Sequence, residues 1–197
     1  MNSHDNTSAF AASDGRARWL TTRDIVLISL VAALVILTKV VFKMPIHVPG
    51  HSGVIWMALY VIGRGLIRRP GAGTMIGLVS GILATFLNPG SSGLFTGVKY
   101  LAPGMVLDVV ALLSREHLDQ PLVGLIAGVL GNLAKLSAAL VVALLLGLPA
   151  GFIAVGLGYS AMTHVVFGAI GGWLGGVVLA RLQRHGLGGA RRTGGAK

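Results

Sequence analysis

The stretch GVKYLAPGMVLDVVAL, Gly97 to Leu112, decides how the rest of the chain is interpreted. It is an apolar segment that nevertheless carries Lys99, Tyr100, Gly104 and Asp108. In a chain this hydrophobic the segment is expected to lie in a bilayer, where a carboxylate near mid-membrane costs about 2.5 to 3.5 kcal/mol. Helical spacing places Tyr100, Gly104 and Asp108 on one face. We therefore expect this face to point into a helix bundle, where a partner offsets the cost.

Composition indicates a polytopic helical membrane protein. Of the 197 residues, 54% are hydrophobic and 11% are charged, and the mean hydropathy is +0.81. Soluble domains carry about 25% charged residues. The absence of cysteine excludes disulfides and thiolate metal sites. The net charge of +10 comes from Lys and Arg located mostly between apolar runs, a pattern that indicates membrane topology and not nucleic-acid binding.

Six apolar runs predict an all-α fold with six transmembrane helices. The expected helices are about Ile25–Phe42, Val54–Ile67, Ala72–Leu87, Gly97–Ser114, Leu122–Leu146 and Phe152–Leu182. We expect residues 1–20 to be a disordered cytoplasmic segment, residues 21–182 to be the transmembrane domain, and residues 183–197 to be a basic disordered tail. Thr22 is predicted to cap the first helix, with Asp24 in its first turn.

The distribution of Lys and Arg predicts the orientation. An even number of helices puts both termini on one side, and that side holds most of the arginines, including Arg64 and Arg68. The opposite side holds Lys39, Lys43 and Lys99 at most. Because positive charge marks the cytoplasmic side, we expect a multi-pass protein of the inner (plasma) membrane with both termini in the cytoplasm.

Small residues recur at four-residue spacing on several predicted helices. Lipid tails are as apolar as leucine, so close contact between helices depends on small side chains. We expect packing within the bundle for the glycine stripes Gly73, Gly77 and Gly81; Gly124 and Gly128; and Gly168, Gly172 and Gly176. A milder stripe of Ser29, Ala32 and Ala33 suits internal packing and contact with another subunit equally well.

Five polar side chains inside the apolar runs need an explanation, namely Lys99, Asp108, Asn132, Lys135 and His164. Ionisable groups in a membrane face a bundle interior, a cavity or one another. Asp108 and Lys135 either form a structural pair or include at least one substrate contact. Lys99 either extends to the interface or contacts substrate, and His164 is either a hydrogen-bonded core histidine or a ligand contact.

Residues near the predicted external side are further candidates. His47 and His51 lie in a Pro- and Gly-rich loop without a nearby carboxylate or thiol, so capping or lining a cavity mouth is favoured over metal binding. Trp56 and Tyr60 share a helix face and form either an aromatic cavity wall or an interfacial belt. The substrate-binding candidates are His51, Trp56, Lys99, Tyr100, Asp108, Asn132, Lys135 and His164. No phosphate loop, HExxH or GxSxG motif is present, and we predict no catalytic residue, metal or cofactor.

The segment IRRPGAGTMIGLVSGILATFLNPGSSG, Ile67 to Gly93, resembles the substrate-binding S components of energy-coupling factor (ECF) transporters. Its basic turn, Pro-Gly-Ala, small-residue helix and Asn-Pro-Gly are most similar to S components assigned to thiamine or its hydroxymethylpyrimidine precursor. The resemblance implies a subunit, not itself an enzyme, that captures a vitamin-like small molecule from outside. Its lids would be residues 47–53, 88–96 and 147–151. It would dock onto a transmembrane coupling subunit, driven by two cytoplasmic ATPases, through Ser29, Ala32 and Ala33.

The charge inventory bears on the ligand. Residues Met75 to Leu87 include no acidic side chain, which a site for a cationic ligand such as thiamine is expected to have. With Lys99 and Lys135 available, a neutral or anionic ligand fits at least as well.

Three hypotheses from different classes remain open. A capture subunit predicts an external cavity of about 300 to 1,000 Å³. A structural or assembly subunit of a membrane complex predicts that Asp108 and Lys135 bond to each other and leave no cavity. An intramembrane enzyme predicts that His164 or His51 acts as a base together with Asp108, within hydrogen-bond reach of one another or of a shared water.

Overall fold

The computed structural model describes residues 20–41, 53–87, 95–147 and 150–186, which form α-helices and no strand. The helices are α1 (Thr22–Val41), α2 (Gly53–Ile67), α3 (Ala72–Leu87), α4 (Phe95–Leu113), α5 (Pro121–Leu145) and α6 (Ala150–Arg184). Their ends agree with the predicted runs to within three residues, so the all-α class is confirmed. The expected disordered termini, most of the three expected lids, and His47 and His51 fall outside the described residues.

Within the described residues, three helices are long and apolar enough to cross a membrane: Phe95–Leu113, Pro121–Leu145 and, within α6, Gly156–Arg184. The helices α2 and α3 are apolar but have only 15 and 16 residues. A helix of that length spans about 24 Å, less than the roughly 30 Å hydrocarbon core of a typical bilayer. The apolar composition of these helices agrees with a membrane protein, whereas the expected number of six spans stays a prediction.

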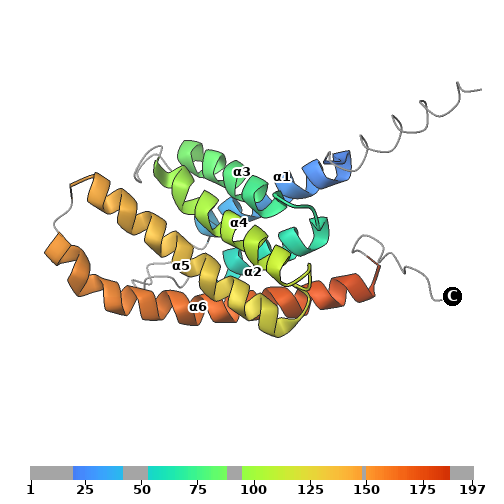
Figure 1. The fold of residues 1–197 in the computed structure, drawn as a ribbon. Helices are drawn as coiled ribbons and strands as arrows, with labels where there is room; N and C mark the ends of the chain where they lie inside the picture. The colour runs from blue at the N-terminus through green and yellow to red at the C-terminus, as the bar shows by residue number, and fades with distance from the viewer. Residues whose placement is uncertain (1–19, 42–52, 88–94, 148–149, 187–197) are drawn as a thin grey trace, which may run out of the picture.

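Helix α2 lies at the centre of the bundle and contacts all five other helices. Helices α5 and α6 run antiparallel along one side, and α3 and α4 form a second antiparallel pair (Figure 1). The first turn of α1 and the last turn of α6 lie at the same end of the bundle, on the right in Figure 1. The two ends of the described bundle therefore lie together, and the cytoplasmic placement of both chain termini stays a prediction.

The glycine stripes pack the helices against one another, as predicted. A Cβ atom added at Gly73 would lie 2.6 Å from the carbonyl oxygen of Gly104, and one at Gly77 would lie 2.7 Å from that of Tyr100. Gly128 and Gly172 bring the backbones of α5 and α6 into equally close contact. Real Cβ atoms do not approach oxygen this closely, so only glycine permits these contacts.

The N-terminus of α1 is capped one residue earlier than predicted. The amide of Asp24 donates to the Thr21 hydroxyl over 3.3 Å, and the Thr21 amide donates to the Asp24 carboxylate over 2.9 Å. This reciprocal arrangement is a capping box with an aspartate in the acidic position. Thr21, and not Thr22, is therefore the N-cap residue.

Candidate functional site

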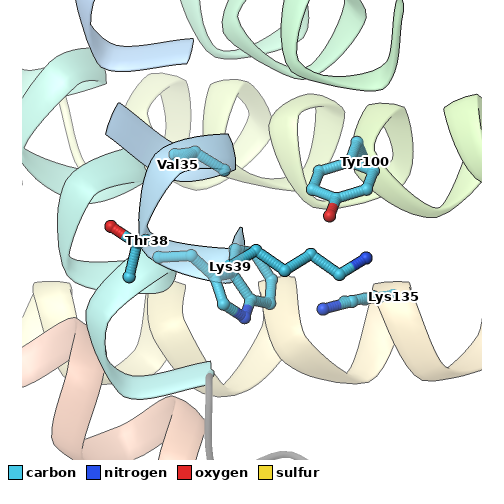
Figure 2. Close-up of a pocket in the computed structure, with 6 residues that line it drawn as sticks. Val35, Thr38, Lys39, Tyr100 and Lys135 are labelled. Atoms are coloured by element: carbon cyan, nitrogen blue, oxygen red, sulfur yellow. The ribbon is translucent and has the colours of Figure 1, made fainter. Parts of the chain in front are cut away.

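A small cavity lies near the end of the bundle opposite the one that holds the first turn of α1. It opens between the last part of α1, the first turn of α2, the first part of α4 and the middle of α5 (Figure 2). Its lining consists of Val35, Thr38 and Lys39 from α1, Trp56 from α2, Tyr100 from α4 and Lys135 from α5. Three of the predicted substrate-binding residues, Trp56, Tyr100 and Lys135, therefore meet at one place.

Two lysine side chains occupy this cavity beside aromatic rings. The Lys135 ammonium lies 4.1 Å from the centroid of the Trp56 ring and 5.8 Å from that of Tyr100. The Lys39 ammonium lies 5.2 Å from the Tyr100 ring centroid. The two lysines point toward the same space below the Tyr100 hydroxyl (Figure 2). Attraction between a cation and the face of a ring holds each ammonium in place.

The aromatic residues of the site are buried and present hydrogen-bonding groups. Trp56 is 5% exposed and Tyr100 is 3% exposed. Within the described part of the chain, the Trp56 indole nitrogen and the Tyr100 hydroxyl have no hydrogen-bond partner. Tyr60 packs edge-on against Trp56 and donates its hydroxyl to the Tyr100 backbone carbonyl over 3.1 Å. Trp56 and Tyr60 thus do not form a lipid-facing belt, because both lie inside the bundle.

The enclosed volume is smaller than the expected cavity. It measures about 10 Å³, room for about one water-sized group. The side chains of Lys39 and Lys135 extend into the space between the helices and reduce it (Figure 2). The cavity in this part of the structure can thus enclose a single polar group and not a whole vitamin-sized molecule.

Asp108 does not pair with Lys135; this expected structural pair is wrong. One Asp108 oxygen accepts a 2.6 Å hydrogen bond from Nε of Arg64 and a 3.0 Å bond from the Gly73 amide. The other oxygen accepts 2.7 Å bonds from the amide and hydroxyl of Thr74. The Asp108 carboxylate is therefore bound by the Arg64 guanidinium and by backbone amides of the first turn of α3. Amides at a helix N-terminus have no partner within the helix and favour an anion.

Arg64 is the centre of a buried ionic network that the sequence analysis did not identify. Its side chain is 1% exposed and binds Glu116 with both terminal nitrogens, over 2.8 and 2.7 Å. Glu116 follows α4 in a left-handed conformation with φ 64°, and Arg115 has φ 52°. The network joins α2, α3, α4 and the α4–α5 connector at the end of the bundle opposite the cavity. A signal was present in the sequence, because an arginine inside the apolar run VIGRGLI is itself expected to face the bundle interior.

Other predicted site residues lie outside the cavity lining. Asn132 is 1% exposed and donates to the backbone carbonyl of His164 over 2.8 Å. The His164 ring is bonded to the Ser160 carbonyl over 2.8 Å, so it is a hydrogen-bonded histidine of α6. Within the described residues, no hydrogen bond joins Asp108 to His164. Asp108 bonds to Arg64 and α3, and His164 bonds to Ser160. The direct Asp108–His164 contact that an intramembrane enzyme with these two residues would use is therefore not formed.

The second predicted lysine, Lys99, is partly exposed and precedes Tyr100 of the cavity lining. Its charge and that of Lys39 both act on Lys135, so the three lysines form one positively charged cluster. His51 lies outside the described residues.

The predicted docking stripe divides between two faces of α1. Ser29 and Ala33 are exposed, whereas Ala32 is fully buried. The exposed face also carries Leu30 and Leu34. A surface contact through α1 would thus use Ser29 and Ala33 together with apolar neighbours, and not Ala32.

Comparisons with known proteins relate this fold to one class. No family model matches the sequence, and no curated protein matches it. The structure is similar to a solved structure described as "Crystal structure of an S-component of ECF transporter". The TM-score is 0.61 at 20% sequence identity, and the match covers 85% of this chain and 87% of the other. The chain therefore has the fold of that S component.

Proposed function

We propose that this protein is the substrate-capture subunit of an ECF-type importer. It spans the inner (plasma) membrane six times with both termini in the cytoplasm and takes a vitamin-like small molecule from outside. It delivers this molecule with a separate transmembrane coupling subunit and cytoplasmic ATPases. The observation that carries the proposal is the fold, matched over 85% of the chain, together with a cavity that two lysines and two aromatic residues line at the end opposite the Arg64 network.

The distribution of polar groups supports a binding role. Arg64, Asp108 and Glu116 bond to one another at one end. At the other end, the indole nitrogen of Trp56 and the hydroxyl of Tyr100, both in the cavity lining, are among the buried polar atoms that have no partner in the described residues. Buried polar groups are normally hydrogen-bonded. Groups without a protein partner are expected where a ligand supplies one. The alternative of a purely structural subunit predicted an Asp108–Lys135 bond, which is not formed.

The proposed ligand contacts follow from this geometry. Lys39, Trp56, Tyr100 and Lys135 line the cavity, and Lys99 lies in the same charged cluster. His51 stays a proposed contact at the cavity mouth. Asn132 acts indirectly, because it fixes α5 against α6. Ser29 and Ala33 are the proposed contacts to the coupling subunit.

Native mass spectrometry tests the proposal. The full chain, purified in a mild detergent, is incubated with the small-molecule fraction of a bacterial cell extract, washed, and released in the spectrometer. We expect the wild type and Arg184→Met, which changes an exposed residue at the far end of α6, to retain one added mass. We expect Lys135→Met to retain much less of it. A wild type that retains no small molecule from any extract fraction would contradict the capture role.

A further inference from the structure

The charged groups of the chain are separated along the bundle. The sequence contains six acidic residues. Asp5 and Asp14 precede α1, Asp24 lies in its first turn, Asp108 is bound to Arg64, and Glu116 and Asp119 lie between α4 and α5. In sequence, residues 42–52, 88–94 and 148–149, which link the described helices, contain no Asp or Glu. No carboxylate of the described residues lies within ion-pair distance of Lys39 or Lys135.

The cavity combines positive charge with hydrogen-bond donors. Lys39 and Lys135 contribute ammonium groups, Trp56 contributes an indole N–H, and Tyr100 contributes a hydroxyl. The remaining hydroxyl of the lining, on Thr38, already donates to the Leu34 carbonyl over 2.7 Å. Lys and indole groups are donors only, with no acceptor capacity. Such a lining satisfies an acceptor that carries negative charge and offers little to a cation.

Burial strengthens this preference. The half-buried Lys135 ammonium has no carboxylate partner among the described residues, which is costly inside a bundle, and the rings of Trp56 and Tyr100 compensate in part. Lys39 and Lys99 add repulsion at Lys135. An anion that enters the cavity relieves both costs at once, whereas a cation increases them.

From this arrangement we infer that the captured substrate is an anion, with a carboxylate or phosphate group held between Lys39 and Lys135 beside Trp56 and Tyr100. The inference deepens the proposed function and rests on it. The enclosed volume of about 10 Å³ receives one polar oxygen of such a group, and the rest of the molecule lies outside it. The same lysines disfavour a thiamine-like cation as the substrate.

Three probes of one shape and different charge test the inference: benzoate, benzamide and benzylammonium. Thermal unfolding of the full chain in non-ionic detergent is followed by tryptophan fluorescence at increasing probe concentration, and binding appears as a rise in Tm. We expect benzoate to bind about tenfold or more tightly than benzamide, since hydrogen bonds to charged groups are the stronger ones. Benzylammonium should not raise Tm. If benzamide or benzylammonium raises Tm as much as benzoate, or if no probe raises it, the inference is wrong.

Matched variants locate the effect. Lys135→Met is expected to weaken benzoate binding about tenfold, and Lys39→Met, at an exposed side chain, serves as a second variant should the first not fold. Lys135→Arg keeps the charge and should keep the preference for benzoate. Arg184→Met removes an equal charge outside the site and should behave as wild type. Equal loss in Arg184→Met and Lys135→Met would show a general charge effect and overturn the assignment.

Identification of the molecule retained from cell extract separates the two proposals. A retained metabolite with a carboxylate or phosphate supports both. A retained neutral or cationic metabolite overturns the anion inference and leaves the capture role intact. Preference for benzoate without any retained metabolite supports an anion site and contradicts the capture role. Retention of phosphate-headgroup lipid alone shows that the cavity holds membrane lipid, which overturns the substrate assignment.

Discussion

Replacement of Arg64 by methionine should destabilise the protein strongly. Arg64 is 1% exposed and makes three charge-assisted hydrogen bonds of 2.6 to 2.8 Å to Asp108 and Glu116. Removal of one partner from a buried ion pair costs about 3 to 5 kcal/mol. The Glu116 side chain is 33% exposed, so water can hydrate its carboxylate once the arginine is removed. Asp108 keeps its hydrogen bonds to Gly73 and Thr74. We therefore expect the lower end of the range, about 3 kcal/mol.

Thermal unfolding in detergent, followed by tryptophan fluorescence, measures this effect. A loss of about 3 kcal/mol corresponds to a Tm lower by about 6 to 12 °C for a chain of this size. Arg184→Met, at an exposed position, is the control and should stay within about 0.5 kcal/mol of wild type. A double-mutant cycle with Asp108→Asn should give a coupling of at least about 1 kcal/mol. An Arg64→Met protein as stable as the control would refute the assignment of Arg64 as the centre of a buried network.

Three further outcomes follow from the geometry. The effects of Asp108→Asn and Lys135→Met on the free energy of unfolding should add, within about 0.5 kcal/mol in a double-mutant cycle. The reason is that Asp108 bonds to Arg64 and to α3, not to Lys135. A larger coupling energy would indicate that Asp108 and Lys135 do interact. Gly128→Ala should lower the free energy of unfolding by about 1 to 3 kcal/mol, because a Cβ atom there would clash with the Gly168 carbonyl. Gly156→Ala, with open space around it, is the control and should be neutral or slightly stabilising. Equal effects of the two variants would argue against the close α5–α6 contact. Thr21→Ala should lower the free energy of unfolding by about 1 kcal/mol, because the capping box is lost. This prediction is wrong if the wild type and the variant give the same melting curve by circular dichroism.

The helices were predictable because hydrophobic runs and turn residues are local signals. The glycine stripes were equally informative: Gly73, Gly124 and Gly172 do bring neighbouring backbones together, and only glycine fits such contacts. By contrast, the N-cap residue was misplaced by one position, since Thr21 and Thr22 both have the required hydroxyl and backbone geometry decides between them.

The predicted Asp108–Lys135 pair was wrong because the prediction did not compare how far each residue lies from the end of its helix. Asp108 lies five residues before the end of α4, whereas Lys135 lies fourteen residues after the start of α5, at the same end of the bundle. At 1.5 Å per residue these positions differ in depth by about 13 Å. Arg64, three residues before the end of α2, matches the depth of Asp108. Comparison of depths along the predicted helices would have favoured Arg64 over Lys135.

The candidate site was predicted in part. Trp56, Tyr100 and Lys135 were expected to line a cavity, and they do. The contribution of Lys39 was missed, because its position near the end of a hydrophobic helix indicated only topology. Its reach into the space beside Tyr100 depends on how α1 packs against the bundle, and local sequence does not specify this.

Site-directed labelling tests most directly whether the cavity faces outward and holds a captured molecule. The natural chain has no cysteine, so Thr38→Cys introduces a single thiol into the cavity lining while all lysines are kept. Intact cells are treated with a membrane-impermeant maleimide, with and without the small-molecule fraction of cell extract. We predict labelling from outside that the extract reduces. Labelling that requires permeabilised cells, or that the extract leaves unchanged, would contradict an external capture site.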